Sequence, residues 1–269
     1  MVQVITRPCV LVFAGHDPSG GAGIQADAEA IAAQGAHALT VVTALTVQDH
    51  NRVYAVNPVA SEIVRAQAKT LIENIPIAVV KIGIVGSKEN ALVIAEMISA
   101  LLMKQPQLPI IVDPVLGSGH GNALNTDDPV ASLSPLLKIA TIITPNLPEI
   151  ARLIPHFSSL SEQAFALMQH RCTDVLIKGG HGAEMDVQNV HFNVDENKTQ
   201  PQTWAWPRLE GEFHGSGCTL ASALAGQIAI GKPLQEALIC AQEYTQSSLQ
   251  MAYAIADGQF IPNRIKIQK

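Results

Sequence analysis

The sequence predicts a single α/β domain with a mostly parallel central sheet. Short β-rich runs alternate with longer helical patterns along most of the 269 residues, which is typical of βαβ units. The composition is 48% hydrophobic but only 4% aromatic, which suits helices packed on a buried parallel sheet. Neither an internal repeat nor a low-complexity tract divides the chain, so we expect one domain over residues 1–269.

In the first half of the chain, strand and helix patterns alternate regularly. Apolar residues recur at three- and four-residue steps in its helical segments, while its strand segments are short apolar runs. Gly35 is expected to end the first helix. Strands are expected over residues 9–14, 38–46, 77–83 and 108–114, and helices over residues 23–35, 59–74 and 89–103.

The second half begins with two more buried strands, over residues 140–146 and 174–180, separated by helical sequence. After Gly180 the pattern changes to two segments typical of edge strands. Residues 189–194 and 202–206 are expected to form an antiparallel hairpin around a polar loop. Two helices then complete the domain, starting near Gly217 and Pro233.

Charge and cysteine content limit the partners and the compartment. A net charge of −6 argues against nucleic acid or an anionic membrane as a partner. The four cysteines show no CxxC spacing, which favours reduced thiols in the cytoplasm. The apolar run CVLVFAG near the N-terminus is too short for a signal peptide, and no run is long enough to cross a bilayer.

Polar clusters follow five of the expected strands. They read GHDPSGGAG, VQDHN, DPVLGSGHG, TPNLPE and KGGHG. Because ligands of open α/β sheets bind at the carboxyl ends of the strands, these clusters predict one shared site.

The first glycine-rich cluster fits neither familiar nucleotide motif. Gly20 is followed by Gly21 and Ala22 where a P-loop requires Lys and Ser or Thr, and the spacing of a dinucleotide fingerprint is absent. The cluster could be an ordinary β–α turn. Asp27, just inside the following helix, favours a functional turn.

Several side chains in the other clusters suit a metal–phosphate site. Asp113, at a strand end, can hold magnesium through water. Asn146 and Glu149 have the spacing of a helix capping box, and they also suit hydrated Mg²⁺. Lys178 ends a buried strand and is expected to point its ammonium into the site. The GSGHG stretch, residues 117–121, fits a flexible loop as well as it fits a functional one.

The turn Gly215-Ser216-Gly217 leads directly into an alanine-rich helix with Cys218 in its first turn. A helix N-terminus of this kind binds anions and is expected to lower the pKa of a thiol. Two chemistries remain open. Cys218 could be a hydrolase nucleophile with His214 as its base, or a general base for a substrate hydroxyl that attacks a phosphoryl group. A packed helix with an incidental cysteine is the third interpretation.

Together these motifs resemble the hydroxymethylpyrimidine and phosphomethylpyrimidine kinases of thiamin biosynthesis. The motifs occur in order over essentially the whole chain: AGHDPSGGAGIQAD, VTALTVQ, KIG, VDPV, TPNLPE, IKGGH and HGSGCTLASALA. The resemblance implies the ribokinase-like fold, a three-layer α/β/α sandwich. It also implies ATP and Mg²⁺ as cofactors, and a pyrimidine alcohol and its monophosphate as substrates.

The resemblance further implies a role for each matching residue. Phosphoryl transfer is expected to involve Gly215, Gly217 and Cys218. The metal–nucleotide phosphates are expected at Lys178, Asn146, Glu149 and Asp113, the last two through water. The pyrimidine is expected at Gln48, Asp27 and Gly15. The Gln48 amide offers both a donor and an acceptor, as an aminopyrimidine edge requires.

Two stretches depart from the family pattern. The loop after DPV lacks a lysine and has His120 instead, and Glu212-Phe213 precedes the last glycine turn. We therefore expect the second phosphorylation to be slower than the first. The alternatives are a vitamin B6 kinase, a cysteine hydrolase and a non-catalytic pyrimidine sensor. We also expect a homodimer.

Overall fold

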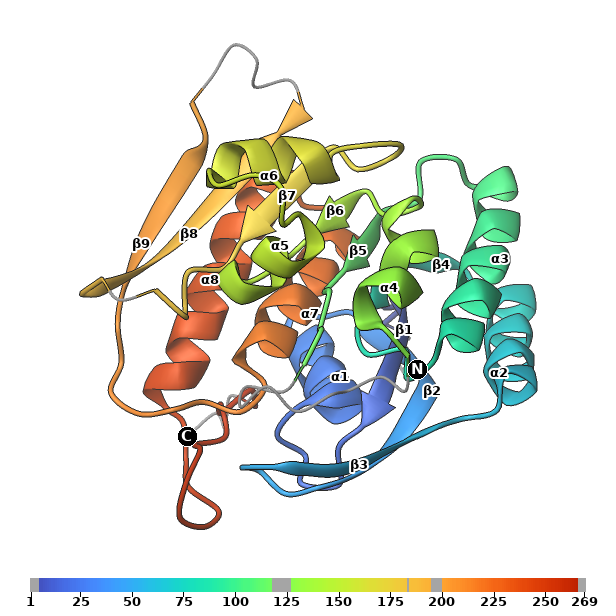
Figure 1. The fold of residues 1–269 in the computed structure, drawn as a ribbon. Coiled ribbons are helices and arrows are strands. Elements are labelled where there is room, and N and C mark those ends of the chain that lie inside the picture. Colours follow the sequence, from blue (N-terminus) through green and yellow to red (C-terminus); the bar gives the residue numbers. More distant parts are fainter. Residues whose placement is uncertain (1–4, 118–126, 183, 195–199, 266–269) are drawn as a thin grey trace.

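The computed structural model describes residues 5–117, 127–182, 184–194 and 200–265. Its strands form one sheet of nine in the order β3-β2-β1-β4-β5-β6-β7-β8-β9 (Figure 1). They are β1 (Cys9–His16), β2 (His37–Gln48), β3 (Val53–Pro58), β4 (Ile77–Ile82), β5 (Ile110–Val112), β6 (Ile142–Ile143), β7 (Asp174–Ile177), β8 (Asp186–Asn193) and β9 (Gln202–Pro207). Six neighbouring strands pair in parallel: β2, β1, β4, β5, β6 and β7. At the two edges of the sheet, β3 pairs antiparallel with β2, and β8 pairs antiparallel with β7 and β9.

Helices cover both faces of the sheet. One face carries α2 (Ser61–Asn74), α3 (Lys88–Lys104), α4 (Pro129–Leu137), α5 (Leu147–Leu153) and α6 (Leu160–Leu167). The other face carries α1 (Gly23–Ala33), α7 (Ser216–Ala229) and α8 (Leu234–Gln250). The molecule is therefore a three-layer α/β/α sandwich with one apolar core on each side of the sheet, as the sequence predicts.

Strand β1 shows how the sequence builds two cores at once. Leu11 and Phe13 pack into the core beneath α2 to α6, while Val10 and Val12 pack into the core beneath α1, α7 and α8. Successive side chains of a strand point to opposite faces, so a continuous apolar run is what a strand covered on both sides requires.

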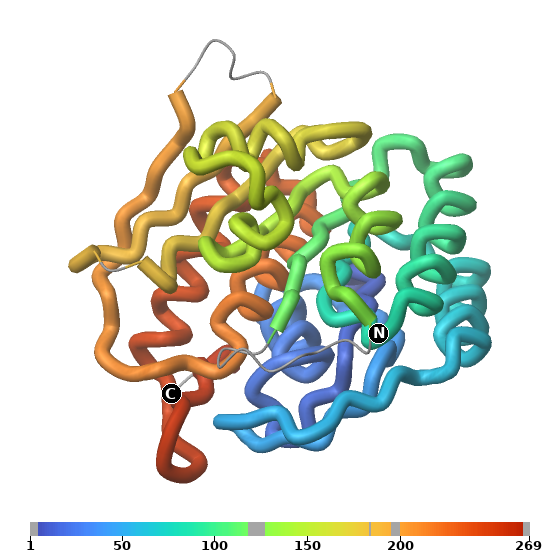
Figure 2. Tube along the Cα trace, in the orientation of Figure 1, coloured from blue at the N-terminus to red at the C-terminus, as the bar shows by residue number. Residues whose placement is uncertain are grey.

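The first and last parts of the chain lie side by side. Helix α1 packs against α7, and α7 packs against α8, although nearly 200 residues separate α1 from α7 (Figure 2). The strand order also reverses at β1, which lies between β2 and β4. This arrangement gathers the turns after β1 and before α7 at one end of the sheet, at the switch point where α/β folds bind ligands.

The expected strands and helices are all present, and the hairpin of β8 and β9 is antiparallel as predicted. Two elements were missing from the prediction. Strand β3 is a short edge strand whose pairing with β2 depends on tertiary structure, and α4 contains Pro135, which weakens a helical pattern. Among the described residues, the helices are too short or too polar for a membrane span.

Candidate active site

A cavity of about 490 Å³ opens at the carboxyl ends of the parallel strands. The predicted convergence of polar clusters is correct, because residues from all five clusters line this cavity. The site residues expected from the sequence that line it are Gly15, Gln48, Asp113, Asn146, Glu149, Lys178, Gly215, Gly217 and Cys218. Asp27 does not. Gly117 lines the cavity, whereas Ser118, His120 and Gly121 lie outside the described residues.

The turn before α7 is shaped by glycine. Gly215 is the N-cap residue of α7 and has a φ of 78°, in the left-handed region that glycine adopts without strain. A Cβ at this position would overlap the carbonyl oxygen of Gly21. No side chain caps this helix end, so the backbone N–H groups of its first turn remain available to an anion.

Cys218 lies in the first turn of α7 and is partly exposed to the cavity. Its electrostatics differ from expectation. Burial, together with the carboxylates of Asp27 and Asp113, raises the pKa of Cys218 to about 11, although the ammonium of Lys81 opposes this effect. The expectation of a partial thiolate at neutral pH is therefore wrong for the ligand-free protein. Burial is the largest of these effects, and it disfavours the charged thiolate.

Lys178 and Asp113 form a buried ion pair on the cavity wall. The Lys178 ammonium donates a hydrogen bond of 2.6 Å to Oδ1 of Asp113, which also accepts one of 3.3 Å from Thr144. A Cβ on Gly217 would lie only 3.1 Å from Nζ of Lys178, so the ammonium lies directly beside the α7 turn. Although burial favours the neutral amine, Asp113 and Glu149 raise the pKa of Lys178 and keep it charged.

Asn146 and Glu149 form the capping box that their spacing predicts. The Asn146 side chain accepts a hydrogen bond of 2.8 Å from the Glu149 backbone, and Glu149 accepts one of 2.7 Å from the backbone of Asn146. Burial raises the pKa of Glu149 to about 7, and the charge of Asp113 adds to this effect while Lys178 opposes it. Two carboxylates thus share one poorly solvated wall, where a cation would be favourable.

Asp27 lies beneath the cavity in a buried ion pair. Both of its oxygens accept from the ammonium of Lys81, at 2.8 and 2.9 Å, and Ser222 donates a further bond of 2.6 Å. Asp27 and Lys81 are both fully buried. The structure therefore does not bring Asp27 together with Gln48 and Gly15 in the cavity. Ser222 lies one helical turn beyond Cys218, which puts this ion pair under the thiol.

Gln48 and Gly15 line the same cavity, at the ends of β2 and β1. Within the described part of the chain, the side-chain amide of Gln48 has no hydrogen-bond partner. The Gln48 amide is therefore available to a ligand that offers both a donor and an acceptor.

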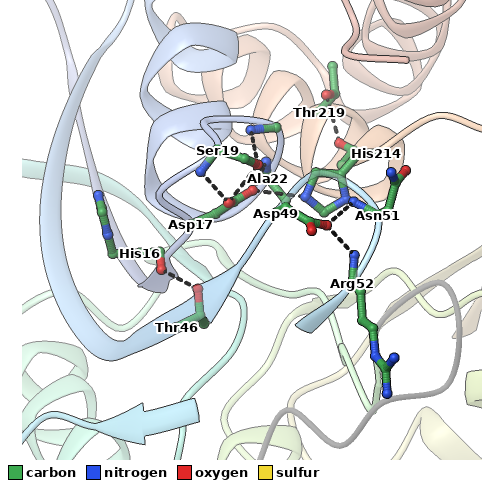
Figure 3. A network of polar contacts seen from close by, with 12 residues as sticks. His16, Asp17, Ser19, Ala22, Thr46, Asp49, Asn51, Arg52, His214 and Thr219 are labelled. Atoms are coloured by element: carbon green, nitrogen blue, oxygen red, sulfur yellow. Dashed lines mark hydrogen bonds and ion pairs between the residues drawn. The ribbon is translucent and has the colours of Figure 1, made fainter. Parts of the chain in front are cut away.

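His214 and Asp17 join the two glycine turns, a link that the sequence analysis did not identify. Nε2 of His214 donates to Oδ2 of Asp17 at 2.8 Å, and Asp17 also accepts from the backbone of Ser19 and of Ala22 (Figure 3). Burial would raise the pKa of Asp17, but the hydrogen bonds from His214 and Ser19 hold it at about 2. Among the described residues no hydrogen bond joins His214 to Cys218, so the hydrolase interpretation lacks the contact between nucleophile and base that it requires.

Known proteins resemble this chain over almost its full length. The phosphomethylpyrimidine kinase family matches residues 17–263. The hydroxymethylpyrimidine/phosphomethylpyrimidine kinase of Streptomyces coelicolor is 35% identical over 260 residues, which are 94% of this chain and 93% of that protein. The enzyme of the same name from Rhizobium meliloti is 35% identical over 255 residues, with 93% of each chain covered.

Solved structures agree with the fold. The crystal structure of phosphomethylpyrimidine kinase from Clostridium difficile matches with a TM-score of 0.74 and 30% identity, over 91% of this chain and 100% of that one. An ADP complex of Bacillus subtilis pyridoxal kinase matches with a TM-score of 0.83 at 24% identity, over 96% and 98% of the two chains. The second match supports the ribokinase-like fold alone. By its sequence and its fold, this chain belongs to the hydroxymethylpyrimidine/phosphomethylpyrimidine kinase family.

Proposed function

We propose that this protein is an ATP-dependent kinase that phosphorylates 4-amino-5-hydroxymethyl-2-methylpyrimidine, and then its monophosphate, in thiamin biosynthesis. One observation carries the proposal. The uncapped N-terminus of α7, with Cys218 in its first turn, opens into the same cavity as Lys178 and the amide of Gln48. One cavity would thus hold both the phosphate and the heterocycle.

The phosphate side of the cavity suits a group in transfer. Backbone N–H groups of the first α7 turn and the ammonium of Lys178 would stabilise the charge on the equatorial oxygens. Both are fixed before the ligand arrives, Lys178 by Asp113 and the turn by the backbone of Gly215. Such preorganisation is the main contribution that a protein can make to phosphoryl transfer. Asn146 would contact the nucleotide from the adjoining helix end.

The carboxylates of Asp113 and Glu149 fit a hydrated magnesium ion. Mg²⁺ retains several water ligands and is held by one or two carboxylates together with the substrate phosphates. The pKa of Glu149, which burial and the charge of Asp113 raise to about 7, supports this role, because a bound cation would offset both effects. Bound magnesium would neutralise part of the nucleotide charge. Asp113 would have a second role, because its hydrogen bond orients Lys178.

The acceptor side positions the substrate hydroxyl. The Gln48 amide would hold the aminopyrimidine edge, with the heterocycle against the backbone of Gly15. The thiolate form of Cys218 would take the hydroxyl proton as the oxygen attacks the γ-phosphorus of ATP and ADP leaves. Because its pKa is about 11 in the ligand-free protein, the thiolate is scarce at pH 7, and we expect general-base catalysis to contribute less than positioning.

A coupled ADP-release assay tests the function. The substrates are the hydroxymethylpyrimidine, its monophosphate, and pyridoxal as the competing heterocyclic alcohol, each with ATP and Mg²⁺. Preferred turnover of the two pyrimidines supports the proposal. Preferred turnover of pyridoxal would establish the vitamin B6 alternative, and pyrimidine binding without ADP release would establish a sensor. Ester hydrolysis without ATP would establish the hydrolase.

We further propose a cytoplasmic homodimer whose subunits are single kinase domains. The exposed apolar side chains of Leu45, Val47 and Tyr54 along the β2–β3 edge support a dimer through this edge. The net charge of −6 is unfavourable for binding nucleic acid or anionic membranes. Light scattering of the purified protein would distinguish a dimer from a monomer.

A further inference from the structure

A buried guanidinium lies behind the two glycine turns. Arg264 follows the last helix and is only 1% exposed. Its Nε donates to the hydroxyl of Thr219 at 2.8 Å, and its Nη2 donates to the carbonyl oxygen of Gly21. Nη1 lies 3.4 Å from a carboxylate oxygen of Glu29. Arg264 therefore contacts the turn after β1 and the first turn of α7 at the same time.

The hydrogen bonds form a continuous chain between the two turns. Thr219 donates its hydroxyl hydrogen to the carbonyl oxygen of Gly215 at 2.9 Å while accepting from Arg264. A Cβ on Gly215 would lie 2.9 Å from Nη2 of Arg264 and would overlap the oxygen of Gly21. The guanidinium thus supports the backbone of both turns, and Arg264 itself does not line the cavity.

A contribution to stability does not by itself explain why a charged residue is buried at position 264. A buried charge loses its hydration, and its only carboxylate partner in the described residues, Glu29, is partly exposed and 3.4 Å away. The segment that carries Arg264 has other anchors. The Tyr244 hydroxyl donates to the Arg264 carbonyl oxygen at 2.8 Å, and the Asn263 backbone donates to Ser248 at 2.9 Å. The planar fork of arginine, with donors in fixed directions, is what bridging two turns requires.

We propose that Arg264 is a positioning residue for phosphoryl transfer. It holds the α7 turn, which binds the transferred group, in register with the turn after β1, which adjoins the acceptor. It does not touch the substrate. The inference rests on the proposed kinase function, and it predicts that losing the guanidinium harms the transition state more than it harms the binding of either substrate.

The main comparison is between Arg264→Met and Arg264→Lys, measured by kcat and by KM for the pyrimidine and for ATP. Arg264→Met is expected to lower kcat at least tenfold while both KM values change less than threefold. Arg264→Lys is expected to remain at least fivefold impaired, because an ammonium restores the charge without the two-directional fork. Full recovery in Arg264→Lys would overturn positioning through the fork.

Thr219 provides a second test that leaves the guanidinium in place. Thr219→Val removes the hydroxyl that links Arg264 to Gly215 and should lower kcat, as Arg264→Met does. Thr219→Ser keeps the hydroxyl and should retain wild-type kcat. Equal activity of the valine and serine variants would contradict the proposal. These variants keep it testable even if Arg264→Met fails to fold.

Tyr244→Phe is the matched control, since it weakens the same segment without touching either turn. It is expected to lower Tm while leaving kcat within twofold of the wild type. A loss of kcat equal to that of Arg264→Met would mean that segment stability, not the bridge, controls the rate. An inactive wild-type enzyme in the same assay would instead refute the proposed function.

Binding provides a readout independent of turnover. ADP with aluminium fluoride and magnesium mimics the transferred group, whereas ADP alone does not occupy that position. Arg264→Met should weaken the aluminium fluoride complex at least tenfold and ADP less than threefold. Equal weakening of the two complexes would overturn the inference.

Discussion

Nε2 of His214 lies 2.8 Å from Oδ2 of Asp17, although 197 positions separate the two residues in the chain. The contact joins the turn before α7 to the turn after β1 on the cavity side, whereas Arg264 joins the same turns from behind. A Cβ on Gly21 would overlap the His214 ring, so the absence of a side chain there lets the imidazole lie against the backbone. The two halves of the site are thus fixed relative to each other by contacts on two sides.

Replacing Asp17 by Asn should reduce acid stability in a defined pH range. The pKa of Asp17 is lowered from 3.8 to about 2, so its contribution is complete above pH 4 and is lost as the pH falls through 2. At about 1.4 kcal/mol per pKa unit, the shift corresponds to roughly 2 kcal/mol. Urea unfolding at pH 5 should show Asp17→Asn less stable by about this amount, and the difference should shrink between pH 4 and pH 2. The exposed carboxylate of Asp186 provides the control, Asp186→Asn. A constant difference across this range would contradict the assignment.

Replacing Cys218 by Ala tests whether its thiolate is the proton acceptor, as we propose. We expect kcat to fall roughly 10²-fold, at the lower end of the usual range for a general base, while the dissociation constant of the pyrimidine changes little. Steady-state kinetics and calorimetric titration measure the two quantities. A kcat close to that of the wild type would remove the thiol from the mechanism.

The reactivity of the thiol should follow its raised pKa. Because the pKa of Cys218 is about 11, its alkylation by iodoacetamide should be slow at pH 7 and should accelerate continuously to pH 10 in the ligand-free protein. Mass spectrometry resolves the labelling of each cysteine. The buried Cys172, whose pKa burial raises to about 12, is an internal control that should react still more slowly. A rate that levels off near pH 8 would mean that the helix end outweighs burial after all.

Glu149→Gln should change the magnesium requirement and its pH dependence. The pKa of Glu149 is about 7, so the wild-type enzyme should need more magnesium as the pH falls from 8 to 6. The variant should need more magnesium at pH 8 and show no further increase down to pH 6. Glu162→Gln is the matched control, because Glu162 occupies the same capping position at the start of α6, away from the cavity. Identical titrations of Glu149→Gln and the wild type would leave Glu149 with its capping role only.

Gln48→Leu tests the substrate edge. Losing one polar pair should weaken pyrimidine use by ~1–3 kcal/mol, while basal ATP hydrolysis stays close to that of the wild type. The kcat/KM for the pyrimidine and the rate of ADP release without it measure the two effects. If both activities fall together, Gln48 has a structural role.

The parts of the fold that could be predicted are those with a local signal. The run from Cys9 to Ala14 is apolar throughout because it forms a strand covered on both faces, and the glycine turn before Cys218 marks a helix start. The polar clusters could be assigned to one site because parallel strands align their carboxyl ends. None of these inferences required knowledge of which residues meet across the fold.

The parts that could not be predicted depend on tertiary contacts. Lys81 within an apolar strand was a usable signal, since a buried ammonium needs a carboxylate, but nothing local identifies Asp27 as that carboxylate. The pKa of Cys218 was misjudged for a similar reason. The helix end is visible in the sequence, whereas the burial that raises the pKa is not. The contacts of Arg264, from a segment after the last helix, have no local signature.

The pairing of the chain's first and last turns also has a consequence for how the protein folds. Gly21 and Arg264 are separated by 243 positions and Asp27 and Ser222 by 195, so these contacts close very long loops, whose entropic cost must be met before the contacts form. Contacts of such high sequence separation slow folding. We therefore expect the central parallel strands to pair before the two glycine turns meet. A partly folded chain would then contain much of the sheet without being able to transfer phosphate.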